Sequence, residues 1–485
     1  MKIEELFLDI PVTKIFGTAG AGKTTKLIEI VDGLIKKGVK PERIAFCSFT
    51  KKAVDEMVER VLTKYKQYSD KNFPYFKTIH AICYASSENK KMMGYKDFLS
   101  IAQSLGLKIS SVINAEDCGG DKTGDKVVTI ESLSRLRMVS LERQWEDCNF
   151  IDVPLHLVYD WKRSLNFYKK NKNLIDFTDL LENYKVGQLP VDYIIIDEAQ
   201  DLAPLQWKVL NIISKNCKKV YIAGDDDQLI YKWAGADVEY ILGIKNDEEI
   251  ILDKSHRLPS NVYKLSRDIL KRIKLRKAKD CEPTKENGNI TYIQALDDIQ
   301  FYPNQEYLIL IRNKFLWLPI SEELKRRGLP FLSFGKSSID DSNIRKIYIW
   351  EQFRKTKKIT ATDYLSICKL SSILNSYDRF SLPQKYLEFA WYDIFNLFPN
   401  NIIEYYRKAL SLGYKLKNTP NIKISTIHQA KGGESDNVIV FTDVTQNTWK
   451  NINSDDEHRV WYVAVSRSKK NLFIVNSQST RYYKI

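Results

Sequence analysis

A glycine-rich segment near the N-terminus, residues 15–25, restricts the fold more than any other part of this sequence. From Gly17 to Thr24 it matches the pattern G-x-x-x-x-G-K-[ST]. Glycines in such a loop let the backbone turn tightly, so that several N–H groups point at one anion. Lys23 adds a positive charge for the β- and γ-phosphates of a nucleotide, and the Thr24 hydroxyl is a ligand for Mg²⁺. The sequence therefore predicts a phosphate-binding loop made of Gly17, Thr18, Ala19, Gly20, Ala21, Gly22, Lys23, Thr24 and Thr25.

The residues after this loop predict a helix. Leu27, Val31 and Leu34 recur at helical spacing, and Gly38 ends the run. Because the N-terminus of a helix carries a partial positive charge, this helix would direct that charge at the bound phosphates.

Length and charge narrow the class of protein. A chain of 485 residues is long enough for two to four domains. Its net charge of +14 favours a polyanion such as nucleic acid as partner, although a basic protein without such a partner has the same composition. The basic stretch Arg267–Lys279 is a candidate phosphate contact or an exposed, charged helix face.

Cysteine usage and hydropathy exclude several other classes. The seven cysteines form no C-x-x-C pair, which argues against zinc, iron–sulfur and disulfide scaffolds and fits a reducing cytosol. No apolar run approaches the roughly 18 residues of a membrane span, so we expect no membrane partner.

Two apolar runs, residues 193–196 and 219–223, end in acidic residues. Asp197 and Glu198 follow the first run, and three aspartates follow the second. Continuous apolar runs are typical of buried parallel strands, and open α/β sheets bind ligands at the carboxyl ends of their strands. We therefore expect Asp197 to hold Mg²⁺ jointly with the loop threonine, and Glu198 to act as general base on the attacking water.

Other polar residues are candidates for the same site. Gln228 follows the end of the second run and is positioned to contact a γ-phosphate, whereas Asp225–Asp227 belong to the site or form a solvated turn. Arg257 and Arg467 lie in the second half of the chain. An arginine directed at the γ-phosphate stabilises the charge that develops during phosphoryl transfer, although most single arginines are surface residues.

The order of apolar runs and helical stretches predicts an α/β protein with two parallel-sheet domains, each interrupted by a mainly helical insertion. Further strands are expected at 307–311, 423–425, 438–442 and 472–475. The predicted segments are 1–83 and 173–250 for the first α/β domain, 84–172 for its insertion, 251–344 and 421–485 for the second α/β domain, and 345–420 for its insertion.

Taken in order, these motifs resemble the UvrD/Rep/PcrA group of superfamily 1A DNA helicases over nearly the whole chain. The most specific parts are Asp197–Asp201, Gly224–Tyr231 and Thr426–Gly432. The full set of matching stretches is Gly17–Thr25, Phe49–Ala53, Thr78–His80, Asp176–Leu181, Asp197–Asp201, Gly224–Asp237, His256-Arg257, Ser425–Glu434 and Glu457–Arg467.

The resemblance implies two RecA-like motor domains that bind ATP and Mg²⁺ between them and move 3′→5′ on single-stranded DNA, coupling hydrolysis to strand movement and duplex unwinding. The implied partners are single-stranded DNA, single-strand/duplex junctions, and replication or repair proteins. The implied location is the cytoplasm, on the nucleoid or, for a viral chain, in the host. By matching position, the ATP machinery comprises Lys23, Thr24, Asp197, Glu198, Gln228, Arg257, Glu434 and Arg467.

The same positional match implies a set of residues that face the DNA strand. A motor must hold any sequence, and aromatic faces stack on bases without reading them. For Trp233 the alternative is a core tryptophan. The implied strand-facing residues are Phe49, Thr50, His80, Tyr231, Trp233, Thr426 and His428.

The chain departs from the family pattern in three places. Residues 1–16 lack the glutamine that reads adenine in the family, and His256 stands where a base-stacking tyrosine is usual; we still place His256 in the nucleotide site. The second insertion is shorter than usual. Because of the shorter insertion, translocation is a safer prediction than strong unwinding, and an ATP-driven translocase that remodels protein–DNA complexes with little unwinding stays an alternative. An inactive nucleotide-binding scaffold is a further alternative, against which the intact Lys23, Asp197, Glu198 and Arg467 argue.

Overall fold

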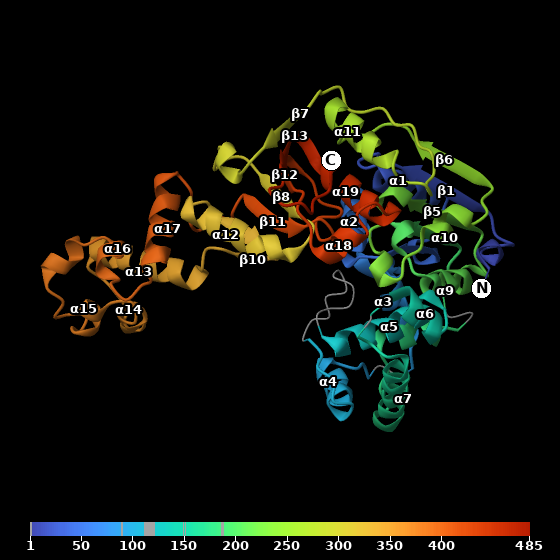
Figure 1. The fold of residues 1–485 in the computed structure, drawn as a ribbon, viewed down its shortest axis with the longest axis horizontal. Helices are drawn as coiled ribbons and strands as arrows, with labels where there is room; N and C mark the ends of the chain where they lie inside the picture. Colours follow the sequence, from blue (N-terminus) through green and yellow to red (C-terminus); the bar gives the residue numbers. More distant parts are fainter. Residues whose placement is uncertain (1, 89–90, 111–121, 149, 151, 186–188) are drawn as a thin grey trace. The chain divides into compact units, whose positions relative to one another are not determined.

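The computed structural model describes residues 2–88, 91–110, 122–148, 150, 152–185 and 189–485 (Figure 1). The chain divides into two compact units: unit 1 is Met1–Asn287 with Asn453–Ser466, and unit 2 is Gly288–Ile452 with Arg467–Ile485. Each unit contains one sheet made mainly of parallel strands. The predicted α/β class with two parallel sheets is therefore confirmed.

The sheet of unit 1 has six strands in the order β3-β2-β4-β5-β1-β6, and every neighbouring pair is parallel. The predicted runs at 193–196 and 219–223 form its buried central strands β4 and β5. The strands are β1 (Val12–Gly17), β2 (Ile44–Ser48), β3 (Phe76–Thr78), β4 (Tyr193–Asp197), β5 (Lys219–Gly224) and β6 (Glu248–Leu252).

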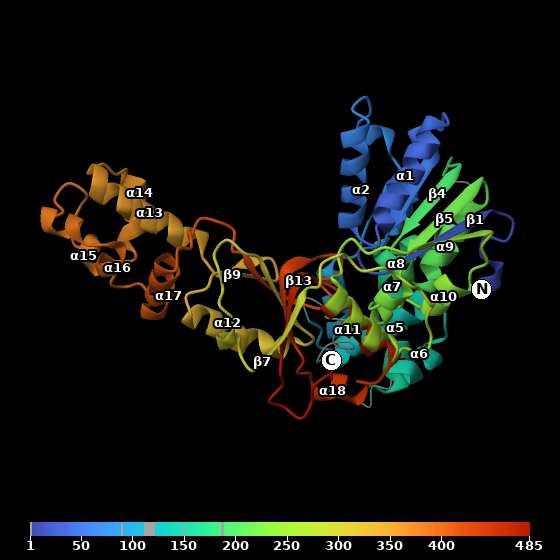
Figure 2. The ribbon, with the colours of Figure 1, turned by 90° about the horizontal axis from the view of Figure 1, so that it is seen from above.

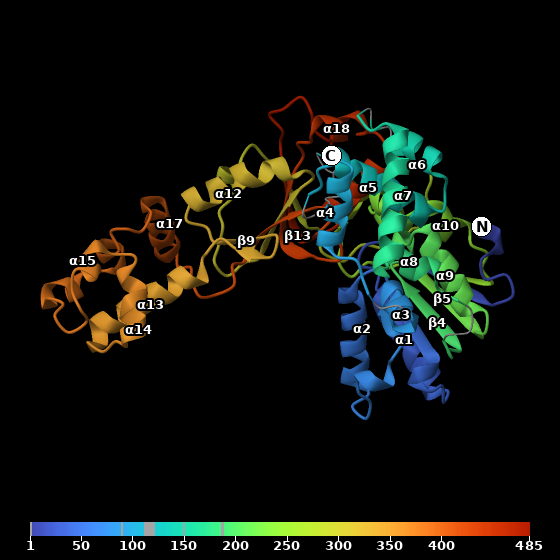
Figure 3. The ribbon, with the colours of Figure 1, turned by 90° about the horizontal axis from the view of Figure 1, so that it is seen from below.

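Helices cover both faces of this sheet because successive residues of a strand point to opposite sides. Ile195 packs in the core under α1 (Lys23–Lys36) and α2 (Lys51–Lys64), whereas its neighbour Ile196 packs in the core on the other face. Figures 2 and 3 show α1 and α2 on one side of the strands and α8 and α9 on the other. The helices of that second face are α3 (Ile79–Ser86), α8 (Phe177–Glu182), α9 (Pro204–Ser214) and α10 (Val238–Gly243).

The described residues of the predicted first insertion are mainly helical. Trp161 and Leu165 lie at the centre of a separate apolar core that these helices share. The helices are α4 (Tyr95–Ser104), α5 (Thr123–Arg137), α6 (Leu141–Cys148) and α7 (Leu155–Lys172).

Unit 1 extends beyond residue 250, the predicted end of the first motor domain. Two later helices, α11 (Ser260–Leu270) and α19 (Asp455–Val465), belong to it. Arg257, which we expected in the second half of the protein, therefore lies in the unit that carries the phosphate loop. The finer division of the chain into six segments stays a prediction.

The sheet of unit 2 has seven strands in the order β10-β9-β11-β8-β12-β13-β7, with only the β10–β9 pair antiparallel among the described strands. All four strands that we predicted for this region are present. The strands are β7 (Asn289–Ile293), β8 (Tyr307–Ile311), β9 (Phe331–Ser333), β10 (Lys336–Ser337), β11 (Ile422–Thr426), β12 (Ser435–Phe441) and β13 (Ser468–Val475).

A helical cluster with its own core follows β10 and precedes β11. Trp350, Phe395 and Tyr406 are among the buried residues at its centre. Its helices are α13 (Asp341–Thr356), α14 (Ala361–Cys368), α15 (Ser372–Asn375), α16 (Trp391–Ile394) and α17 (Asn400–Ser411). The other α-helices of unit 2 are α12 (Trp317–Arg326) and α18 (Gln446–Lys450). Across the described residues, every helix is too short or too polar to cross a bilayer.

Candidate functional site

The register of the central strands brings the predicted nucleotide-site residues of unit 1 to one edge of its sheet. In the parallel pairs, Phe16 of β1 faces Gly224 of β5, and Ile196 of β4 faces Ile222 of β5. The carboxyl ends of the three strands therefore align. The loop after β1, the acid pair after β4 and the aspartates after β5 all leave the sheet at this edge, where α/β proteins bind ligands.

The phosphate loop has the backbone that its glycines permit. Gly20 and Gly22 have φ values of +73° and +82°, and Gly22 is the N-cap of α1. The buried Lys23 ammonium donates to the carbonyl oxygens of Gly17, at 2.9 Å, and of Thr18, at 3.4 Å. Lys23 thus folds back over its own loop, with its charge held beside the place where phosphates would bind.

The acid pair Asp197–Glu198 lies where β4 ends. Asp197 is buried and accepts the N–H of Glu198 at 2.9 Å. Burial, and then the Glu198 carboxylate, raise the pKa of Asp197 to about 7, although Lys23 opposes them. A buried carboxylate of this kind is stabilised by a cation, and its oxygens together with the Thr24 hydroxyl are the hard donors that Mg²⁺ prefers. The residues present therefore fit this ion.

Gln200 connects the ends of β4 and β5, a role that we did not predict from the sequence. Its amide nitrogen donates to Glu198 Oε2 at 2.5 Å, and its amide oxygen accepts the N–H of Asp225 at 3.0 Å. Glu198 itself has a left-handed backbone, with φ +50°, which is uncommon for a residue other than glycine and typical of functional sites. The fully buried Gln200 therefore holds the candidate base in position.

The segment Ser255–Arg257 packs directly on the phosphate loop within unit 1. The Ser255 hydroxyl donates to the Ala19 carbonyl at 2.8 Å, and the His256 N–H donates to the Gly20 carbonyl at 2.9 Å. A Cβ added to Gly20 would lie 2.4 Å from the Cβ of Arg257. His256 and Arg257 therefore lie beside the phosphate loop, and Arg257 reaches it from within the same unit. Their roles at a bound nucleotide stay a prediction.

A tyrosine of α19 also contacts the loop. The hydroxyl of the buried Tyr462 accepts the N–H of Ala19 at 3.2 Å. Neither Ser255 nor Tyr462 was singled out from the sequence, because a lone serine or tyrosine carries no pattern. Their proximity to sequence-matched arginines, Arg257 and Arg467, is the signal that could have drawn attention to them.

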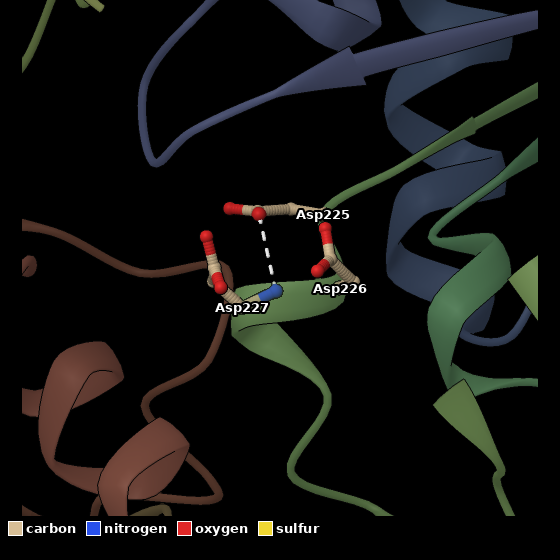
Figure 4. Close-up of side chains that lie close together, drawn as sticks. All are labelled: Asp225, Asp226 and Asp227. Atoms are coloured by element: carbon tan, nitrogen blue, oxygen red, sulfur yellow. Dashed lines mark hydrogen bonds between the residues drawn. The ribbon is translucent and has the colours of Figure 1, made fainter. Parts of the chain in front are cut away.

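Gln228 and the three aspartates before it are buried after β5. The Gln228 amide donates to Asp225 Oδ2 at 2.6 Å. Figure 4 shows the three aspartate side chains around one common space. All three are 0% exposed, so the alternative of a solvated turn is wrong.

Three predicted strand-facing rings are in contact in unit 1. Phe49 stacks on Tyr231 with ring centroids 5.3 Å apart, and Trp233 meets Tyr231 edge to face at 5.7 Å. All three rings are half-buried. The exposed Thr50 is the N-cap of α2, where its hydroxyl accepts the N–H of Ala53. The structure therefore brings Phe49, Tyr231 and Trp233 together as one aromatic group.

His80 has an aromatic neighbour that we did not predict. Phe177, the first residue of α8, meets the His80 ring edge to face at 6.1 Å and is 65% exposed. Burial lowers the pKa of His80, which favours a neutral ring. Phe177 lies within the sequence stretch that resembles the helicase family, so its aromatic side chain was the available signal.

A network of ion pairs fixes the helix that carries Phe177. The N-cap residue Asp176 accepts from Arg135 of α5 at 2.8 Å and from Lys169 of α7 at 2.9 Å. Asp179, in the first turn of α8, accepts from the same two residues. The two helices of the first insertion thus hold the N-terminal end of α8, which presents Phe177 to solvent.

The remaining predicted residues lie in unit 2. The fully buried Arg467 donates to the Gly433 carbonyl at 3.2 Å, and Ser435 is in register with Ser468 of β13. Glu434 and Arg467 therefore lie next to each other at the starts of adjacent strands. Thr426 and His428, expected to face a DNA strand, are both buried. Thr426 caps its own turn by accepting the N–H of Gln429.

A parallel α/β protein with this loop at the edge of its sheet is a P-loop nucleotide-binding protein. Residues 11–249 match the UvrD/REP helicase N-terminal domain, and residues 343–479 match the UvrD-like helicase C-terminal domain. The chain belongs to the UvrD/REP helicase family, as its motifs predicted.

Individual relatives agree with this assignment. A probable DNA helicase II homolog of Mycoplasma capricolum is 26% identical over 375 residues, which cover 68% of this chain and 51% of the relative. The ATP-dependent DNA helicase PcrA of Staphylococcus epidermidis is 25% identical over 365 residues, 67% of this chain and 49% of the relative. This chain thus spans about half the length of these curated relatives. The solved PRRSV helicase aligns with 97% of this chain and 53% of its own, at 10% identity and a TM-score of 0.36.

The contact between the phosphate loop and Arg257 can be tested at Gly20. We expect Gly20→Ala to weaken nucleotide binding at least about tenfold, because a Cβ there would lie 2.4 Å from the Arg257 Cβ and the backbone φ is +73°. The measurement is the Kd for a fluorescent ATP analogue. Gly33→Ala is the control, since Gly33 lies within α1 with nothing within 4 Å of an added Cβ, and it should bind normally. An unchanged Kd for Gly20→Ala would contradict the proposed importance of this packing.

Proposed function

We propose that this protein is an ATP-dependent DNA helicase that moves 3′→5′ on single-stranded DNA and couples ATP hydrolysis to strand movement and duplex unwinding. Family membership supports the class of activity, and the PcrA relative is named an ATP-dependent DNA helicase. The net charge of +14 suits a nucleic-acid partner. The polarity and the unwinding rest on the family resemblance of the motifs.

One observation carries this proposal: the candidate nucleotide site and the aromatic group of unit 1 are only a few residues apart in the sequence. Gln228 is buried at the nucleotide edge of the sheet, bonded to Asp225. Tyr231, three residues later, stacks on Phe49 in the aromatic group. If a γ-phosphate moved the Gln228 side chain, the short segment from Gln228 to Tyr231 would pass that movement to the aromatic rings, which can stack on bases.

The residues of unit 1 divide the chemistry of hydrolysis among them. In our proposal Lys23 and the loop N–H groups bind the phosphates, and His256 lies beside the base. When bound, Mg²⁺ held by Thr24 and Asp197 offsets charge on the β- and γ-phosphate oxygens. Glu198 takes a proton from the attacking water, and Gln228 orients that water or the γ-phosphate.

Arginines supply the remaining positive charge. Arg257 is packed against the loop from within unit 1. We propose that Arg467 of unit 2, with Glu434 beside it, is drawn to the triphosphate when ATP binds, and that hydrolysis releases it. Ligand-driven closure and reopening of domains on the μs–ms timescale is a common way to convert such binding into movement.

In our proposal, aromatic residues hold the DNA strand by stacking on its bases and do not read the base sequence. The aromatic group of unit 1, together with His80 and Phe177, offers ring faces to successive bases, and Thr50 offers a hydroxyl to the backbone. Thr426 and His428 are buried in unit 2. For these two residues a strand contact requires that side chains around them move.

Tailed duplexes test the function and its direction. We expect a duplex with a 3′ single-stranded tail to be unwound in the presence of ATP and Mg²⁺, and one with only a 5′ tail to remain paired. ATPase activity should rise when single-stranded DNA is added. Efficient unwinding from the 5′ tail would overturn the polarity, DNA-stimulated ATPase without unwinding would indicate a remodelling translocase, and the absence of ATPase activity would indicate a scaffold.

The role of Glu198 is tested by Glu198→Gln, which keeps the side-chain shape and removes the proton acceptor. We expect DNA-stimulated kcat to fall at least about 100-fold, since a positioned general base contributes about that much, while the Kd for ATP changes little. The control is Glu59→Gln, on the exposed face of α2, which should hydrolyse ATP normally. A normal rate for Glu198→Gln would show that another group is the base.

Phe177 provides a test of the strand-facing surface. Phe177→Ala should weaken binding of single-stranded DNA by about tenfold, because stacking on one aromatic ring contributes about 1–3 kcal/mol per base. ATPase activity without DNA should not change. Phe167→Ala on α7 is a matched control, because Phe167 is 68% exposed and Phe177 is 65% exposed. Equal DNA affinities for the two variants would count against a stacking role for Phe177.

A further inference from the structure

The proposed function gives no role to the acidic cluster Asp225–Asp227. One carboxylate oxygen from each residue lies within 4.8 Å of the other two, and all three side chains are 0% exposed. Figure 4 shows that the three carboxylates surround one space, as the ligands of a divalent cation do. Three buried negative charges at such distances are strongly destabilising unless positive charge compensates them.

The compensating charge is supplied by the chain itself. The ammonium of Lys279, also 0% exposed, lies 3.0 Å from Asp225 Oδ1 and 3.0 Å from Asp227 Oδ2, and it forms an ion pair with Asp226 as well. Burial acts to lower the pKa of Lys279, but the three carboxylates outweigh it and hold that pKa above its usual value. Lys279 therefore stays charged and occupies the place of a metal ion.

The residues before Lys279 complete the arrangement. Arg276 makes a two-pronged contact with Asp227, from Nε and Nη2, at 2.7 Å each. The N–H of Lys277 donates to Asp226 at 2.7 Å. At this end of the basic stretch 267–279, Arg276 and Lys279 thus direct their charges at the aspartates, whereas the Lys277 ammonium pairs with Glu249 at 2.6 Å.

Asp225 connects this charge cluster to the nucleotide site. Its Oδ1 faces Lys279, while its Oδ2 accepts from the Gln228 amide at 2.6 Å. Its N–H donates to Gln200, whose own amide donates to Glu198. Although burial raises the pKa of Asp225, Lys279 and then Lys23 hold it below its usual value. A single ionised carboxylate thereby orients the side chain that we expect to contact the γ-phosphate.

The cluster also adjoins the phosphate loop. A cavity of about 40 Å³ is lined by Thr18 of the loop, by Tyr462, and by Arg276 and Lys279. A displacement of the Lys279 side chain would therefore change the packing next to the phosphate loop and the surroundings of the Gln228 amide.

We propose that Lys279 is a positioning residue for ATP hydrolysis: its ammonium replaces a structural cation among the three aspartates and, through Asp225, fixes the orientation of the Gln228 amide. The inference rests on the proposed ATPase function and adds a residue to it. Lys279 touches neither the nucleotide nor the attacking water in this scheme. Its effect should therefore depend entirely on the presence of Gln228.

A double-mutant cycle tests this dependence. Lys279→Met keeps the length of the side chain and removes the charge. We expect DNA-stimulated kcat to fall at least about tenfold, with less than about threefold change in the KM for ATP and in the Kd for single-stranded DNA. In a Gln228→Ala background the same substitution should change kcat by less than about twofold, because coupled residues are not additive. The matched control is Lys264→Met on the exposed face of α11, which should leave kcat unchanged.

A second variant guards against a folding defect in Lys279→Met. Asp225→Asn leaves one negative charge fewer around the lysine while weakening the acceptor for Gln228, so it should fold and show the same loss of kcat and the same dependence on Gln228. A kcat near wild type for either variant, or equal losses with and without Gln228, would overturn the inference. If the wild-type protein itself lacks DNA-stimulated ATPase activity, the proposed function fails instead, so the two failures are distinguishable.

Discussion

The parallel pairing of β4, β5 and β1 is the constraint on which the rest of the structure depends. Because their carboxyl ends align, the phosphate loop, the acid pair and the aspartates after β5 meet at one edge although they are far apart in the sequence. Gln200, which donates to Glu198 and accepts from the Asp225 N–H, then connects the ends of β4 and β5. Pairing of the strand backbones thus brings the parts of the site together, and side-chain hydrogen bonds then hold them in place.

Much of the fold could be predicted because its signals are local. The central strands β4, β5 and β8 are buried and apolar, so each is visible in the sequence as a continuous apolar run. The edge strands β6 and β7 were missed, because they are mostly exposed and lack such a run.

The phosphate loop and the acid pair could be predicted for the same reason, whereas their partners could not. Lys279 and Asp226 are 53 positions apart, and no spacing rule joins a lysine to an aspartate over that distance. The packing of Ser255 and Tyr462 on the loop is likewise tertiary. Arg257 was singled out by its motif, but its membership of unit 1 follows from where the chain folds back.

The lysine among the aspartates differs from a metal ion in one respect that matters for how the protein responds to its surroundings. A tethered ammonium has a fixed local concentration, whereas a metal ion must be taken up from solution and can be removed by a chelator. A chelator of divalent ions therefore leaves the three aspartates paired with Lys279, so the charge balance of this part of the fold does not depend on the metal concentration.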